Sequence, residues 1–310
     1  MSSQHISNLS IIVLLFGTLI SIALTICIAV VFTLGVARTS PHRENGDERE
    51  SVYLVKPCEC GCPSIRGSWP WQMLLIQYDQ MNSPEGYCGG SLITREHVLT
   101  AAHCVKGYSP GKIGIIPSVH EFNEDDWPQS SLYIADQIYI HESYDDRRLT
   151  DDIAIIRLRK SIEFNENVSR VCLSSAHLSN EPLREGHVLI ATGCRLIHFG
   201  NQTKSRELDQ TRLEYIPEEH SQCITLKNGS ENERAGQMCA YLQSTPLSHG
   251  NSGGPLVRSL IHSNGKIFYE QVGMMCDNFR QSALTTNYSN LFTRVSYYEK
   301  WIHLRTQITL

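Results

Sequence analysis

Three side chains from separate parts of the sequence could together activate a hydroxyl group as a nucleophile. A serine hydroxyl is a weak nucleophile until a base takes its proton, and the base needs a third group that holds it in the right tautomer. His103 follows the apolar segment Leu99–Ala102 beside Cys104, Asp152 precedes an apolar run, and Ser252 lies among glycines. This base, carboxylate and hydroxyl could therefore serve nucleophilic catalysis.

The residues around Ser252 favour a turn that can stabilise a developing negative charge. The segment Gly250-Asn-Ser-Gly-Gly-Pro-Leu256 is rich in glycine, so backbone N–H groups can converge there on an oxyanion. A second carboxylate, Asp151, stands next to Asp152 and is an alternative partner for the histidine.

Short strands must position these groups. From Trp69 onward, short apolar runs are separated by Gly, Pro, Asn and Asp, a pattern that predicts an all-β barrel or sandwich. The clearest predicted strands are Met73–Ile76, Ile138–Ile140, Ile153–Ile156 and Val188–Ile190. The last segment, Tyr297–Leu304, has apolar residues at helical spacing and predicts a terminal helix.

The N-terminal part of the chain predicts attachment to a membrane. Residues 9–37 are apolar and uncharged, long enough for a transmembrane signal anchor, whereas a cleaved signal peptide has a shorter core of about 7–15 residues. We expect residues 1–8 to form a cytoplasmic tail and the charged residues 38–57 to form a solvated stalk. A cleaved signal and secretion are the alternative. Arg38 and Arg43 follow the segment, and the positive-inside rule taken strictly would put the domain in the cytosol, but the cysteines and glycosylation motifs beyond it favour the outside.

Cysteines and glycosylation motifs indicate an oxidising, extracellular environment. Ten of the 11 cysteines lie beyond the apolar segment, as do four Asn-x-Ser/Thr motifs. The predicted glycosylation sites are Asn167, Asn201, Asn228 and Asn287. The net charge of −5 comes from acidic and basic residues mixed along the chain, which argues against a nucleic-acid partner.

Over residues 58–310 the chain resembles the trypsin/chymotrypsin-like serine protease family. The motifs that carry this resemblance follow one another in order: Gly67–Gln72, Tyr87–Ile93, Leu99–Cys104, His141–Tyr144, Asp151–Leu158, Val171–Leu173, Gln237–Ala240, Gly250–Leu256 and Phe292–Val295. The resemblance implies two six-stranded antiparallel β-barrels with a C-terminal helix and the site between them. It implies His103 as general base, Asp152 rather than Asp151 as its partner, Ser252 as nucleophile, and the N–H groups of Gly250 and Ser252 as oxyanion donors.

The chain departs from this family at the activation site. Members are activated when a new Ile- or Val-led N-terminus pairs with an aspartate just before the nucleophilic serine. Here Asn251 takes the place of that aspartate, and Arg66 runs directly into Gly67 without an insertable arm. An aspartate without its ammonium partner would be a buried unpaired charge, so the two losses are physically coupled. We therefore expect a single-chain protein.

The specificity pocket implied by the resemblance also departs from trypsin. The residues at these positions are Pro246, Cys276, Asp277, Asn278 and Asn290. Proline removes the charge that attracts Arg or Lys, and asparagine in place of glycine should narrow the slot. We therefore expect a preference for small side chains or none.

The resemblance implies the disulfides Cys88–Cys104 and Cys223–Cys239, and a link from Cys172 to Cys58, Cys60 or Cys62. Two family disulfides are missing; one of them had its partners at Leu189 and Arg258. Cys194 and Cys276 are additional, and their pairing is open. We interpret Cys58-Glu-Cys-Gly-Cys62 as disulfide-forming and the acidic stretch Glu121–Asp126 as a solvated loop, and expect no metal or cofactor.

Two functions fit these features. An intact set of three catalytic residues favours a serine endopeptidase that acts on proteins or peptides, with weak or conditional activity. The altered activation site and pocket favour a silent protease fold that binds an extracellular protein partner. Loss of one oxyanion donor lowers the rate about 10²–10³-fold, so the three residues alone do not distinguish the two.

Overall fold

A computed structural model describes residues 60–62, 69–117, 121–123, 132–174, 182–198, 204–223, 226, 230–242, 252–261, 265–276 and 288–307. All of them belong to the unit that spans Lys56–Leu310. The predicted tail, anchor and stalk, residues 1–57, lie outside the described residues. Within the described part of the chain, no helix has the length and apolar character needed to cross a membrane.

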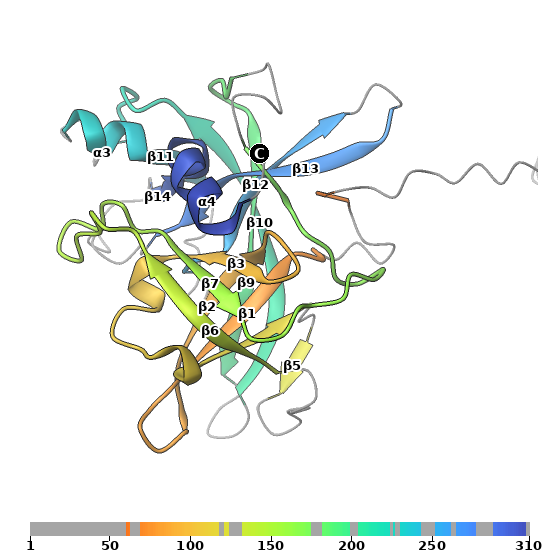
Figure 1. Ribbon diagram of the computed structural model, residues 1–310. Coiled ribbons are helices and arrows are strands. Elements are labelled where there is room, and N and C mark those ends of the chain that lie inside the picture. The colour runs from red at the N-terminus through yellow and green to blue at the C-terminus, as the bar shows by residue number, and fades with distance from the viewer. Residues whose placement is uncertain are drawn as a thin grey trace, which may run out of the picture. The chain divides into compact units, whose positions relative to one another are not determined.

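Six antiparallel strands close into barrel 1, drawn in orange to green in Figure 1. In spatial order they are β1 (Gln72–Tyr78), β2 (Pro84–Leu92), β3 (His97–Thr100), β7 (Ala154–Leu158), β6 (Tyr133–Ile140) and β4 (Ile113–Pro117). The apolar runs predicted as strands at Met73–Ile76 and Ile138–Ile140 lie in β1 and β6. The run Ile153–Ile156 enters β7 one residue late, at Ala154.

A second set of six antiparallel strands forms barrel 2, which the pairing of β10 with β11 closes. Its strands in spatial order are β11 (Gln237–Leu242), β14 (Tyr288–Arg294), β13 (Ile267–Met275), β12 (Pro255–Ile261), β9 (Val188–His198) and β10 (Lys204–Ile216). Two short strands join it from outside: β5 (Glu121–Asn123) pairs with β10, and β8 (Cys172–Leu173) pairs with β13. The two barrels confirm the expected fold.

The helical segments among the described residues are short. They include the 3₁₀ turns Ala102–Cys104, Pro110–Lys112 and Val295–Tyr298 and the α-helices α3 (Glu231–Gly236) and α4 (Glu299–Thr306). The predicted terminal helix is thus present, but its α-helical part begins at Glu299 rather than Tyr297, because the preceding residues wind as a 3₁₀ turn. Trp301 and Ile302 on α4 are buried in the same apolar cluster as the core of barrel 1.

Polar contacts between buried side chains join the two barrels. Ser91 Oγ on β2 donates to Gln271 Oε1 on β13 at 2.6 Å, and Thr192 Oγ1 on β9 donates to Gln72 Oε1 on β1 at 2.7 Å. Such bonds are specific in direction, and leaving either partner unpaired at a buried interface is costly. They therefore fix how one barrel sits on the other, which is what a site built from both barrels requires.

Three disulfides connect described cysteines: Cys88–Cys104, Cys223–Cys239 and Cys60–Cys172. The first two pairs are those that the resemblance implied, and the third resolves which N-terminal cysteine reaches Cys172. Cys62 is also in a disulfide, whereas Cys276 is a buried thiol.

Candidate active site

In barrel 1, His103 follows the C-terminal end of one strand and Asp152 precedes the N-terminal end of the strand paired with it. His103 lies in the 3₁₀ turn after β3, and Asp152 lies just before β7. These strands pair antiparallel, with Thr100 opposite Ala154, so the end of one adjoins the beginning of the other. The apolar sequences of both strands bury them in the barrel, and the polar residues emerge where the strands end.

Asp152 holds His103 through both of its carboxylate oxygens. Oδ2 lies 2.7 Å from the histidine Nδ1, and Oδ1 accepts the His103 backbone N–H at 2.9 Å. Asp152 is fully buried, while the His103 side chain is 23% exposed. An ionised carboxylate can only accept hydrogen bonds, so this contact places a proton on Nδ1 and leaves Nε2 as the basic nitrogen of a neutral ring.

The neighbouring carboxylate, Asp151, has a different environment. It accepts a hydrogen bond from the Tyr298 hydroxyl at 3.1 Å, and its Oδ1 lies 3.8 Å from His141 Nδ1. Its backbone is left-handed, with φ of 52°, which turns successive side chains in different directions. Burial, and next the Asp151 carboxylate, raise the pKa of Tyr298, so its hydroxyl stays protonated and keeps donating. Asp152, not Asp151, therefore contacts His103.

Ser252 belongs to barrel 2 and lies beside the same disulfide that borders His103. Its carbonyl oxygen accepts the Gly89 N–H at 2.7 Å and lies 3.7 Å from Cys104 Sγ. The next residue, Gly253, has φ of +77°, and a Cβ there would lie 2.6 Å from the Gly89 carbonyl oxygen. Glycine is therefore required immediately after the serine for the turn to approach barrel 1 so closely.

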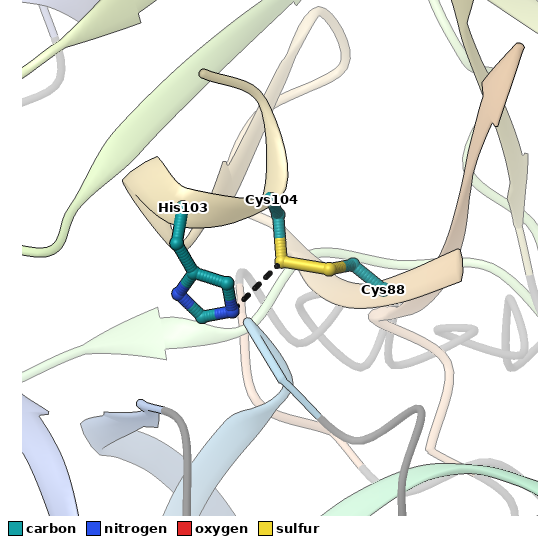
Figure 2. A group of neighbouring side chains, drawn as sticks. All are labelled: Cys88, His103 and Cys104. Atoms are coloured by element: carbon teal, nitrogen blue, oxygen red, sulfur yellow. Dashed lines mark hydrogen bonds between the residues drawn. A yellow bond between two sulfur atoms is a disulfide. The ribbon is translucent and has the colours of Figure 1, made fainter. Parts of the chain in front are cut away.

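Figure 2 shows the Cys88–Cys104 disulfide against the imidazole ring, with His103 Nε2 3.5 Å from Cys104 Sγ. The ligand atoms of these three residues lie within 4.8 Å of one another, a spacing compatible with a metal ion. The two sulfurs are bonded to each other, however, and a disulfide lacks the thiolates that bind zinc. The cluster therefore supports the histidine position rather than a metal centre.

Two residues near Asp152 had no assigned role in the sequence. Thr293 on β14 donates its hydroxyl to the Asp152 carbonyl oxygen at 3.0 Å, and its Oγ1 lies 2.9 Å from the Cys276 thiol. Burial raises the pKa of Tyr144, and the nearby Asp152 carboxylate is the second-largest cause of this rise. Thr293 lies in the motif Phe292–Val295, which helped to identify the family, but nothing in the sequence indicated its contact with Asp152.

The expected pocket residues are only partly within the described part of the chain. Asn290 on β14 is 4% exposed, and Cys276, directly after β13, is fully buried. Pro246, Gly250, Asp277 and Asn278 lie outside the described residues. The structure thus joins His103 to Asp152 and places the Ser252 backbone beside the disulfide that borders the His103 ring.

One of the four predicted glycosylation sites is described. Asn167 lies in a turn where its backbone N–H bonds Asn165 Oδ1 at 2.8 Å, and its side chain is partly exposed. A sugar transferase needs such an accessible turn. Asn201, Asn228 and Asn287 lie outside the described residues.

Comparisons with known proteins agree with this geometry. A family model described as Trypsin matches residues 60–302. The chain is 28% identical to chymotrypsin-C of Bos taurus over 279 residues, 83% of this chain and 97% of that protein. It is 28% identical to transmembrane protease serine 11G of Mus musculus over 254 residues, and 26% identical to transmembrane protease serine 11A of Homo sapiens over 252 residues. Each of these matches covers 80% of this chain but 55% of the relative, so the chain aligns with about half the length of both transmembrane proteins.

Proposed function

Because the chain belongs to the trypsin family of serine proteases, we propose that it is a serine endopeptidase that cleaves extracellular proteins, with weak or conditional activity. The observation that supports this most directly is the contact of 2.7 Å between His103 Nδ1 and the buried Asp152 carboxylate. Ser252, from the other barrel, lies next to the disulfide that borders the same imidazole.

The proposed reaction follows the roles of these three side chains. His103 Nε2 takes the hydroxyl proton of Ser252 while the serine oxygen attacks the carbonyl carbon of the peptide bond. The imidazolium, stabilised by Asp152, then protonates the leaving amine as the carbon–nitrogen bond breaks, and water repeats the sequence on the acyl-enzyme. The backbone N–H groups of Gly250 and Ser252 would hold the oxyanion, a contribution of about 10²–10³ in rate per donor.

Activity is proposed to be weak because Asn251 lacks the negative charge that orders this turn in the family. A neutral amide can hydrogen-bond to backbone or water, but it cannot pair with an ammonium group. The same substitution favours the alternative function, a silent protease fold that binds a protein partner.

Labelling with a fluorophosphonate probe separates these two functions. The probe reacts with a serine only when the hydroxyl is activated, so the full-length chain should be labelled, and the Ser252→Ala and His103→Ala variants should not. Ser259→Ala is a matched control, because Ser259 is an exposed serine on β12 of the same barrel; that variant should label like the parent.

Absence of labelling in a folded parent protein would contradict the endopeptidase proposal and leave the binding function. Equal labelling of the parent and Ser252→Ala would mean that another serine reacts. Peptide turnover that disappears with Ser252→Ala would complete the assignment.

We also propose that residues 9–37 anchor the protein, with the protease domain outside the cell. The apolar length of this segment and the transmembrane proteases among the relatives support the proposal. The chain should stay in the membrane fraction after alkaline carbonate extraction, and Asn167→Gln should remove one glycan. Recovery of a chain that begins after residue 37 from the medium would instead support the secreted alternative.

A further inference from the structure

A buried amide group in barrel 2 has no hydrogen-bond partner. Asn290 on β14 is 4% exposed, and its Nδ2 makes no hydrogen bond within the described part of the chain. Proteins pair nearly all of their buried donors, because an unpaired one loses its hydrogen bonds to water without compensation. An asparagine kept in this state calls for a ligand that supplies the missing acceptor.

The side chain of Asn290 faces the interior of barrel 2. Asn290 pairs with Ala240 across β11 and β14. Ala240 and Phe292 belong to the interior cluster of this barrel, whereas Cys239 and Leu291 belong to the cluster on its other side. Side chains alternate between the faces of a strand, so Asn290 shares the interior face with Phe292.

This interior position adjoins the turn that carries Ser252. Phe292 pairs with Met275 at the end of β13. Met275 in turn exchanges two backbone hydrogen bonds with the turn: its carbonyl accepts the Gly253 N–H at 2.8 Å, and its N–H donates to the Gly254 carbonyl at 2.9 Å. Two residues of a strand span about 7 Å. Asn290 therefore lies at the end of the barrel that faces the proposed nucleophile.

We propose that Asn290 determines specificity by donating its amide N–H to the side-chain carbonyl of a glutamine or asparagine that precedes the cleaved bond. The proposal rests on the endopeptidase function and names its substrate class. It replaces the preference for small side chains expected from the sequence, because the buried Asn290 donor lacks an acceptor. Of the substrate's side chains, the one bound next to Ser252 would be nearest to this end of barrel 2. Its carbonyl oxygen supplies the acceptor that the structure lacks.

Other classes of side chain fit less well. An apolar side chain would leave the Asn290 N–H without an acceptor. An arginine or lysine side chain carries only hydrogen-bond donors, so it could not accept from this N–H either. A carboxylate would be buried without a cation, which costs more than burying an amide. Arg294, the described cation nearest along β14, is already paired with Glu218 and with the Gln237 carbonyl.

The test compares two fluorescent peptides that differ at one position, with glutamine or norleucine, which has a similar length but no acceptor. Dissociation constants are measured on the full-length Ser252→Ala chain, where turnover plays no part. One neutral hydrogen bond predicts that the glutamine peptide binds about tenfold more tightly. Adding Asn290→Leu or Asn290→Ala should reduce this ratio to about one, and the Ser252 parent should show the same preference in kcat/KM.

Trp71→Phe is the matched control, since Trp71 Nε1 is another buried donor without a partner but belongs to the barrel 1 cluster. It should keep the preference for glutamine. Three outcomes would each overturn the proposal. The two peptides could bind the Ser252→Ala chain equally, the preference could survive both Asn290→Leu and Asn290→Ala, or it could be lost in Trp71→Phe. Failure of fluorophosphonate labelling would affect only the endopeptidase function, because the binding comparison does not need a reactive serine.

Discussion

Barrel 1 and barrel 2 have the same number of strands, and each holds one disulfide with a sequence separation of 16, yet they differ in the polar groups that they bury. Among the described residues, barrel 1 leaves one buried polar side-chain atom without a partner, Trp71 Nε1, and pairs its other buried polar side chains. Gln77 Nε2, for example, donates to the Cys104 carbonyl at 2.7 Å, and Thr100 Oγ1 donates to the Gly89 carbonyl at 2.8 Å. These bonds tie together the residues of barrel 1 on either side of the turn that carries His103.

Barrel 2 buries an ion pair and an unpaired amide. Arg258 on β12 and Glu270 on β13 face each other across the sheet, with side-chain exposures of 8% and 0% and 2.6 Å between Nη2 and Oε1. The second oxygen of Glu270 and the amide of Asn290 have no hydrogen-bond partner among the described residues. Arg258 stands where the family resemblance places one cysteine of a missing disulfide, whose other position is Leu189. Among the described residues, barrel 2 thus differs from barrel 1 in burying an ion pair and in leaving two buried polar atoms unpaired rather than one.

The largest expected effect is on the buried ion pair. Glu270→Gln should lower the free energy of unfolding by about 3–5 kcal/mol, because it leaves the Arg258 guanidinium buried without its carboxylate. Asp136→Asn in barrel 1 is the control. Its partner is Arg157, both side chains are 38% exposed, and the loss should be under about 1 kcal/mol. Denaturant unfolding measures both.

Replacing both partners of the buried pair tests whether the loss of stability in Glu270→Gln comes from the Arg258 charge that is left without its carboxylate. Arg258→Met with Glu270→Leu should recover most of the stability lost in Glu270→Gln, since no unpaired charge remains. A double variant as unstable as the single one would mean that the ion pair itself, rather than the uncompensated charge, stabilises barrel 2.

The disulfides come next. Removing Cys88–Cys104 by double alanine substitution should cost about 3 kcal/mol, and removing Cys223–Cys239 should cost the same, because the two close loops of equal length. Thermal and denaturant unfolding of the two variants compare the barrels directly. A much smaller loss for Cys223–Cys239 would indicate that barrel 2 retains less order around its disulfide.

A smaller effect is expected at the contact between the barrels that supports Asp152. Thr293→Val removes the hydroxyl that donates to the Asp152 carbonyl at 3.0 Å, so stability should fall by about 1 kcal/mol and kcat/KM by roughly tenfold as the carboxylate loses its position. Thr192→Val is the matched control. It removes a similar bond from barrel 2 to Gln72, and should cost similar stability without slowing turnover.

Two outcomes would contradict this role of Thr293. If Thr293→Val and Thr192→Val lowered kcat/KM equally, the effect would come from general loosening between the barrels. If Thr293→Val changed stability alone, the Asp152 backbone would need no support from β14.

The smallest effect concerns His97 at the start of β3. Burial lowers its pKa from 6.5, Glu96 partly opposes that shift, and Arg157 adds to it. The folded protein thus binds a proton at His97 less readily than the unfolded chain. Stability should decrease as the pH falls below about 6.5, where the unfolded histidine gains its proton. His97→Phe should flatten the slope of unfolding free energy against pH between about 5 and 7; an unchanged slope would assign it to other groups.

Much of the fold followed from local patterns. Short apolar runs predicted β1, β6, β7 and β9, because a run of alternate or consecutive apolar residues can be recognised as a buried strand without knowing its neighbours. The boundaries were less accurate: β7 begins at Ala154, and α4 begins at Glu299. Those ends depend on neighbours such as Asp151, which the Tyr298 hydroxyl contacts across the structure.

The sequence by itself determined the family, the two-barrel fold and the three residues proposed for catalysis, since ordered motifs along one chain suffice for these. The tertiary structure confirmed the contact of Asp152, rather than Asp151, with His103 that the resemblance implied. It alone decided that Cys60 rather than Cys58 or Cys62 pairs with Cys172, and that Thr293 supports Asp152. The partners in these contacts are 49, 112 and 141 residues apart. No local pattern encodes such distances, because they depend on how the closed barrels bring their strand ends together.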